Sequence, residues 1–171
     1  MTLKTKEKLK RMANKATFFF EDYLENKMHF WKPYRGYDII ITDSEFPENV
    51  SNEFPQKLLL RENEKDFAIS HEVGHCLHFR ANPRLPLIKD IRLELLMETV
   101  ADYFELLYHF KRDPPVEDRT NRFNLPFLCN VNLAFNGQTV DYEFTHDVTF
   151  NELERYDTEL NAIRKREGLI I

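Results

Sequence analysis

The stretch SHEVGHCLHF, residues 70–79, places His71 and His75 four positions apart. Residues at this spacing lie about 40° apart around a helix axis and one turn from each other, so both imidazoles face the same way. Two neutral imidazoles in this arrangement can bind one zinc ion. Glu72 lies beside that face, where its carboxylate can reach a water on the metal, as a general base must. The stretch therefore predicts a metal-binding helix around which the rest of the domain is built.

A catalytic zinc site needs a third protein ligand, and the stretch ETVAD, residues 98–102, offers one on the next predicted helix. We expect Glu98 to bind the metal and Asp102, four positions later, to accept a hydrogen bond from the free ring nitrogen of one histidine. Such a contact fixes the tautomer and the orientation of a metal-binding imidazole. Glu94 and Glu105 lie near the same stripe of the helix and compete with Glu98, but neither is followed by a small residue and an acid.

Three further residues near the two histidines have simpler interpretations. His78 is interpreted as a partly buried or solvent-facing histidine rather than a ligand. Cys76 points about 100° away from the histidine face and is interpreted as a small core residue. Gly74 costs the helix about 1 kcal/mol relative to alanine, so we expect close approach of another backbone there, such as the preceding strand.

Patterns along the chain predict one domain, residues 1–171, of the α+β class, rich in helix and with a small, mostly antiparallel sheet over the metal-binding helix. An N-terminal amphipathic helix is expected over residues 4–28, the metal-binding core over 57–111 and a C-terminal region of unclear role over 116–171. Strands are expected at 37–42, 57–61 and 139–144, with a loop at 43–56. Three further helices are expected. The first begins at a cap at Asn63 and ends at about Phe79, the second runs from about Asp90 to Lys111, and the third covers 150–166 after a Thr149–Glu152 capping box.

The composition limits the classes of function. The chain has 171 residues, with 24 basic and 29 acidic side chains and a net charge of −5, which disfavours a globally basic nucleic-acid binder. The first half of the N-terminal helix is locally rich in lysine, and we interpret this as a solvated face. No apolar run is long enough to span a bilayer, and two cysteines cannot form a disulfide framework. We therefore expect a cytoplasmic protein with no membrane partner.

The motifs His71-Glu72-Val73-Gly74-His75 and Glu98-Thr99-Val100-Ala101-Asp102 together resemble those of gluzincin-type zinc metallopeptidases. The resemblance covers about residues 57–107. In size the chain is closest to the minigluzincins, and the second motif is also similar to that of ImmA/IrrE-type peptidases and of membrane-linked peptidases of the heat-shock-protein X type. The resemblance implies a zincin-like fold with His71, His75 and Glu98 as ligands of one Zn²⁺ per chain, Glu72 as the base and Asp102 behind a ligand. It also implies an edge strand before the motif helix, at Leu58 to Arg61, along which a peptide or protein substrate pairs.

The expected activity is peptide-bond hydrolysis by a zinc-bound water that Glu72 activates. A further donor to the oxyanion is expected, with His146 ranked first among His146, Tyr142, His109 and Tyr108. Asp141 or Asp147 could instead bind the open metal position and keep the enzyme latent. The alternative function is a catalytically weak zincin-fold protein that binds peptides or acts in regulation.

Overall fold

The structure, a computed structural model, describes residues 3–24, 38–41, 48–50, 57–81, 90–117, 131–136, 139–144 and 149–170. Within these ranges the chain is helix-rich with small sheets, which confirms the α+β class. None of the helices in these ranges is both long enough and apolar enough to cross a bilayer. The elements are α1 (Leu3–Leu24), β1 (Asp38–Ile41), β2 (Glu48–Val50), β3 (Lys57–Leu60), α2 (Asp66–Ala81), α3 (Ile91–Phe110), β4 (Val131–Asn136), β5 (Thr139–Phe144) and α5 (Phe150–Arg166).

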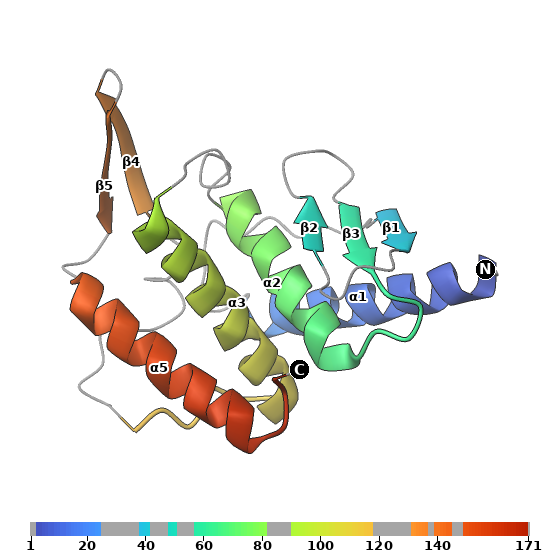
Figure 1. Cartoon of the computed structure of the whole chain (residues 1–171). Coiled ribbons are helices and arrows are strands. Elements are labelled where there is room, and N and C mark those ends of the chain that lie inside the picture. Colours follow the sequence, from blue (N-terminus) through green and yellow to red (C-terminus); the bar gives the residue numbers. More distant parts are fainter. Residues whose placement is uncertain are drawn as a thin grey trace.

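The first three strands form one sheet in the order β1-β3-β2 (Figure 1). Strand β1 pairs with β3 in parallel and β2 pairs with β3 antiparallel, so the sheet is mixed and the expectation of a mostly antiparallel sheet is wrong for it. Side chains of β3 alternate, with Leu58 and Leu60 buried, as expected when one face of a strand packs on helices. The second sheet is the antiparallel hairpin of β4 and β5.

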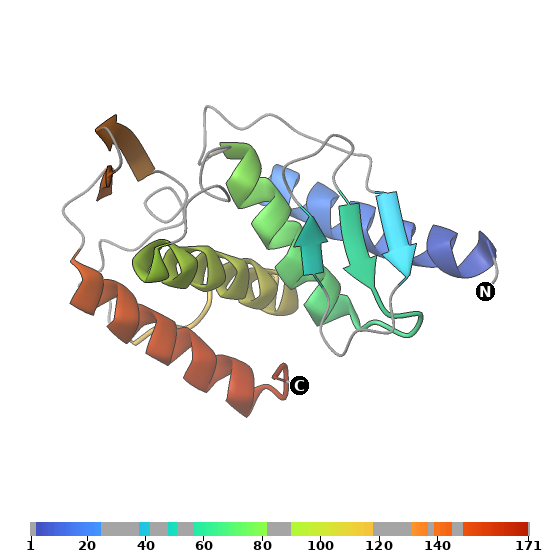
Figure 2. The ribbon, with the colours of Figure 1, turned by 45° about the horizontal axis from the view of Figure 1, so that its top comes forward.

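The strand that precedes the motif helix is not an edge strand. Strand β3 is flanked by β1 on one side and β2 on the other, so the expectation that a substrate pairs with Leu58 to Arg61 is wrong. The loop expected over residues 43–56 contains β2, whose pairing adds a strand outside β3. Strand β2 is the one that lies beside α2 (Figures 1 and 2).

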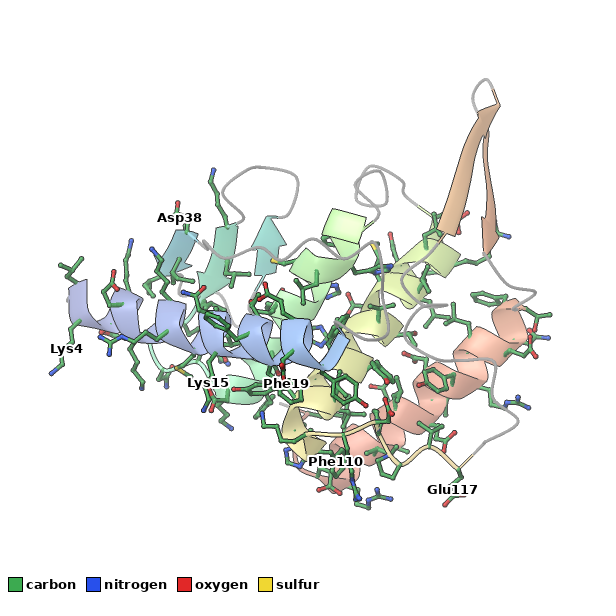
Figure 3. The ribbon with its side chains drawn as sticks, turned by 180° about the vertical axis from the view of Figure 1, so that it is seen from behind. Lys4, Lys15, Phe19, Asp38, Phe110 and Glu117 are labelled. Atoms are coloured by element: carbon green, nitrogen blue, oxygen red, sulfur yellow. The ribbon has the colours of Figure 1, made fainter. Side chains whose placement is uncertain are left out.

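Helix α3 lies between α2 and α5, and α1 crosses behind α2 and under the sheet (Figures 1 and 2). Seen from behind, Phe19 of α1 points toward the C-terminal part of α3, where its ring meets that of Tyr108 edge to face at 5.5 Å (Figure 3). Phe20 packs on Phe104 of α3 in the same way at 4.7 Å, and both are fully buried. These aromatic pairs join the N-terminal helix to α3, the helix that carries Glu98.

Local signals set most helix ends. Asp90 caps α3 by accepting a hydrogen bond from the amide of Arg92 at 2.9 Å, and the expected capping box of Thr149 and Glu152 opens α5. The expected cap at Asn63 is wrong, because α2 begins at Asp66 and its first turn closes on the carbonyl of Lys65. Residues 61–64 form a turn instead, in which Glu64 pairs with Arg61 at 3.1 Å.

Gly74 sets how closely α2 and α3 approach. A Cβ atom built on Gly74 would lie 2.8 Å from Cβ of Phe104 and 3.2 Å from Cα of Ala101. The close approach expected at Gly74 is therefore present, but its partner is α3 rather than the preceding strand. Because His71 lies about one turn before Gly74, this contact also brings the histidines against the middle of α3.

We expect Gly74→Ala to destabilise the fold although alanine is the better helix former. Overpacking typically costs about 1–3 kcal/mol, against a gain of about 1 kcal/mol in helix propensity. The atoms in the way lie on or next to the α3 backbone and cannot rotate aside. Urea unfolding followed by circular dichroism measures the difference in free energy of unfolding. An unchanged or increased stability would show that the two helices separate without cost.

Candidate metal centre

Two histidines of α2 face the two carboxylate oxygens of one glutamate of α3. Nε2 of His71 lies 3.5 Å from one carboxylate oxygen of Glu98, and Nε2 of His75 lies 3.4 Å from the other. The spacing of four within α2 brings the two rings together, with centroids 4.8 Å apart. The contact of α2 with α3 supplies the carboxylate from the neighbouring helix. The arrangement brings together the three side chains that the sequence nominates as ligands.

The two distances to Glu98 are those of neighbouring ligands on a zinc ion. Nitrogen and oxygen ligands about 2.0–2.1 Å from a tetrahedral ion lie about 3.3 Å from one another. The two N···O distances at Glu98 are 3.5 and 3.4 Å, longer than an ordinary hydrogen bond and close to this ligand spacing. Two imidazoles and a carboxylate are also a donor set that suits zinc. The residues present therefore fit a zinc ion.

Glu98 lies at the open side of the cluster. Its side chain is 60 % exposed, whereas those of His71 and His75 are 14 % and 10 % exposed. Partial burial opposes ionisation, but the interaction with the two histidines outweighs it and lowers the pKa of Glu98 below its ordinary value. An ionised, solvent-facing carboxylate is what a metal ligand at the rim of an open site needs to be.

The other ring nitrogen of His71 faces two carboxylates of α3. Its Nδ1 lies 3.1 Å from Oδ1 of Asp102 and 3.4 Å from Oε2 of Glu105, and both acids are buried. Burial by itself disfavours the charged imidazole, but Asp102, Glu105 and Glu98 outweigh it and raise the pKa of His71 well above its ordinary value. Asp102 thus lies next to Nδ1 of His71, but the predicted hydrogen bond is not formed, since neither this nitrogen nor Oδ1 of Asp102 has a hydrogen-bond partner among the described residues.

His75 is oriented by packing. Its ring stacks on that of Phe79, one turn later, with centroids 5.7 Å apart and planes inclined by 10°. Its buried Nδ1 finds no hydrogen-bond partner in the part of the chain that the structure describes. The stacked phenyl ring holds the imidazole so that Nε2 points at Glu98.

Glu72 is buried beside the histidines. One of its carboxylate oxygens lies within 4.8 Å of a ring nitrogen of both His71 and His75. Burial raises the pKa of Glu72, and the two histidines partly oppose that rise. A carboxylate whose pKa is shifted toward neutrality by a dry environment is suited to accept a proton and return it.

The sequence did not predict the contacts of Arg164 with the site or the position of Glu105 beside His71. Glu105 lies on the Nδ1 side of His71, where it pairs with Arg164 of α5 at 3.0 Å and forms with His71 and Asp102 a second group that could hold a metal. Arg164 also lies 2.7 Å from Asp102. The one feature of the sequence that could have indicated a buried role for Arg164 is its position beside the apolar stripe of α5, next to the buried Ile163. Nothing in the pattern along α5 indicates which acid this cation meets.

Several candidates from the sequence lie away from the cluster or outside the described residues. Glu94 is exposed in the first turn of α3, and His78 is completely buried, which corrects its solvent-facing interpretation. His109, in the last turn of α3, pairs with Glu167 at 3.4 Å. Tyr108 packs under Lys111, whose Nζ is 3.1 Å from the ring centre.

The remaining candidates are not described by the structure. His146 and Asp147 lie outside the described residues, as do the side chains of Tyr142 and Asp141.

Comparison of the chain with family models, with curated proteins and with solved structures finds no match. The metal centre is therefore inferred from the donor set and its geometry alone.

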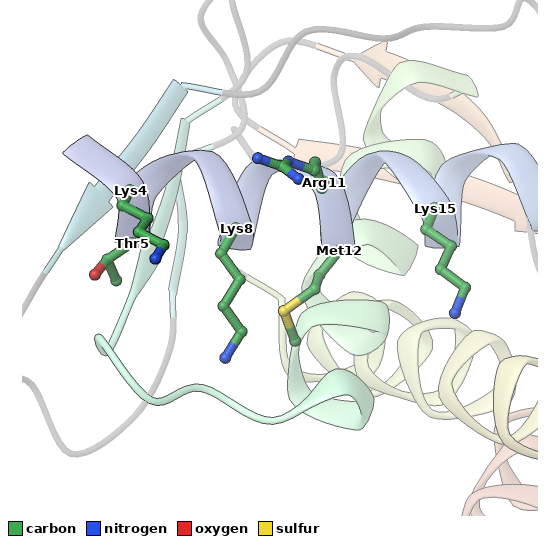
Figure 4. A pocket seen from close by; sticks show the side chains of 6 residues that line it. All are labelled: Lys4, Thr5, Lys8, Arg11, Met12 and Lys15. Carbon is green, nitrogen blue, oxygen red and sulfur yellow. The ribbon is translucent and has the colours of Figure 1, made fainter. Parts of the chain in front are cut away.

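A cationic pocket on α1 is a separate feature of the molecule. Its volume is about 490 Å³, and its cations recur at intervals of four, three and four residues, which places them on one face of the helix (Figure 4). None of the lining residues belongs to the histidine–carboxylate cluster. The pocket is lined by Lys4, Thr5, Lys8, Arg11, Met12 and Lys15.

Proposed function

We propose that this chain is a zinc-dependent metallopeptidase with a zincin-like site. His71, His75 and Glu98 hold one zinc ion, and Glu72 is the general base. The observation that carries the proposal is the convergence of both Nε2 atoms on the two oxygens of Glu98, at 3.5 and 3.4 Å, beside a buried glutamate. A purely structural site has no use for that glutamate, since a closed zinc site takes a fourth protein ligand instead.

When bound, the ion supplies a Lewis acid that acidifies water and polarises a peptide carbonyl. Glu72 accepts the proton of the attacking water and later delivers it to the nitrogen of the leaving amine. Burial of Glu72 keeps its carboxylate away from bulk water and raises its pKa, so the same group can act first as base and then as acid. Asp102 and Glu105 place two negative charges beside Nδ1 of His71, which favours a proton on that nitrogen and leaves Nε2 for the metal.

We propose that an extended substrate pairs with a sheet edge beside α2, the helix of the two histidines. Strand β3 is enclosed by its neighbours, but β2 pairs only with β3 among the described strands and lies next to α2 (Figure 1). A peptide added to the outer edge of β2 would be held by main-chain hydrogen bonds, which accept many sequences. We therefore assign substrate pairing to β2, Glu48–Val50, in place of the Leu58 to Arg61 segment.

The activity is tested by incubating the purified chain with a mixture of unstructured peptides and identifying the products by mass spectrometry. We expect new peptide termini in the presence of zinc, and none after the metal has been removed with a chelator. Readdition of zinc should restore cleavage. A zinc-loaded, folded protein that leaves every peptide of a diverse mixture intact would favour the peptide-binding alternative.

Zinc binding should strengthen as the pH rises. The pKa of His71 is raised by Asp102, Glu105 and Glu98 against the effect of burial, so the metal-free protein keeps a proton on this ring that zinc must displace. Below that raised pKa, each added pH unit should tighten zinc binding by about tenfold per displaced proton. Competition with a chromophoric chelator across the neutral range measures the slope. A zinc affinity that does not change with pH would contradict this assignment.

A further inference from the structure

We propose that Arg164 of α5 is a positioning residue for the metal ligand His71. Its guanidinium holds Asp102 and Glu105 against Nδ1 of His71 and so fixes the direction in which Nε2 of that ring points. The inference rests on the proposed metal centre, but it concerns metal binding and does not depend on catalysis. Through Arg164, the C-terminal helix α5 would help to orient a ligand of the metal site.

The same two carboxylate oxygens contact both Arg164 and His71. Oδ1 of Asp102 lies 2.7 Å from Nη1 of Arg164 and 3.1 Å from Nδ1 of His71. Oε2 of Glu105 lies 3.0 Å from Nη2 of Arg164 and 3.4 Å from the same Nδ1. Nε of Arg164 donates a further hydrogen bond to the other oxygen of Glu105 at 3.2 Å. The guanidinium therefore donates two hydrogen bonds to Glu105 and forms an ion pair with Asp102 through its third nitrogen.

The charges explain why this cation is needed. The side chains of Asp102 and Glu105 are 4 % and 1 % exposed, and both point at a single ring nitrogen. One imidazole N–H cannot satisfy two carboxylates, and two buried anions so close together repel each other. A guanidinium offers five donors in a planar fork and stays charged when buried. With Arg164 in place, both acids can remain behind His71.

Arg164 is itself held by α5. Its Nη1 donates to Oδ1 of Asn161 at 2.9 Å, and the amide of Asn161 donates to Asp157 at 3.0 Å. Asp157 in turn accepts a hydrogen bond from the hydroxyl of Thr99 on α3 at 3.2 Å. Spacings of four and three place these polar residues of α5 on one face, toward α3. These hydrogen bonds within α5 therefore hold the guanidinium of Arg164 in the orientation in which it contacts the two acids.

The test compares zinc affinities of the full chain by competition with a chromophoric chelator, with folding checked by circular dichroism. Loss of a group that orients a metal-binding histidine typically weakens metal binding 10–100-fold, so we expect about that loss for Arg164→Met. Arg164→Lys keeps the charge but cannot form the fork, and we expect an intermediate loss of about fivefold. Arg166→Met makes the same change at an exposed arginine of the same helix and should stay within about twofold of wild type.

Leu160→Ala separates positioning from mere stabilisation. Leu160 is fully buried in α5 and contributes apolar packing, so this variant should lower the melting temperature while leaving zinc affinity near that of wild type. Equal losses of zinc affinity in Leu160→Ala and Arg164→Met would overturn the inference. So would a folded Arg164→Met that binds zinc as tightly as wild type. If Arg164→Met does not fold, an unchanged affinity in Arg164→Lys overturns it. A wild-type chain that binds no zinc would instead overturn the proposed metal centre, and the inference with it.

Discussion

Glu72→Gln should reduce peptide hydrolysis by about 10²–10⁴-fold and leave zinc bound, because a general base typically contributes a factor of this size. Glutamine has nearly the same volume and fills the same buried place, but its amide cannot take up a proton. The change therefore removes the proton transfer and little else. The buried position of Glu72 and the upward shift of its pKa both suit the assigned role.

The measurement is kcat/KM on a peptide identified as a substrate, together with the zinc content of each sample. Glu64→Gln is the matched control, since Glu64 is also a buried glutamate but pairs with Arg61 in the turn before α2. We expect this control to remain within about threefold of wild type, as is usual for changes away from the reacting groups. Hydrolysis by Glu72→Gln at the wild-type rate would remove Glu72 from the mechanism. Loss of zinc in this variant would make Glu72 a ligand instead.

Glu98→Ala should weaken zinc binding by at least about 100-fold, because two imidazoles alone leave the ion without its third protein ligand. The effect should be larger than that of any change behind His71, since Glu98 is the group whose oxygens face both Nε2 atoms. The side chain of Glu98 is 60 % exposed, so its removal leaves no cavity. We therefore expect the melting temperature of the metal-free protein to change little.

The same chelator competition measures this loss, with Glu94→Ala as the matched control. Glu94 lies one turn earlier on α3 and is exposed, so both variants remove an exposed glutamate from one helix. Glu94→Ala should bind zinc like wild type. Equal zinc affinities in Glu98→Ala and wild type would show that the third ligand lies elsewhere, in which case the convergence on Glu98 is a set of ordinary ion pairs.

The features of the site that could be predicted from the sequence are those set by spacing within one helix. The interval of four between His71 and His75, and again between Glu98 and Asp102, fixes which side chains share a face before any tertiary contact forms. The capping box of Thr149 and Glu152 is also local, since Thr149 acts on an amide three residues away, whereas the cap predicted at Asn63 is wrong. Each of these predictions needed only local geometry.

The features that could not be predicted depend on which elements meet. The fork of Arg164 joins residues 59 positions apart in the chain, and nothing in α5 indicates that it packs against α3. The order β1-β3-β2 depends on how the connections cross, so the position of β3 between two strands was not apparent from three leucines in a row. Gly74 was recognised as a close approach, but its partner is set by the packing of two helices rather than by the neighbouring sequence.

The central claim is that this cluster is a zinc site, and the most direct test is the metal content of the chain purified without chelator. Elemental analysis should find about one zinc per chain, the stoichiometry expected for a site of three protein ligands. A protein that carries no zinc, and takes up none when zinc is added to the folded chain, would contradict the account.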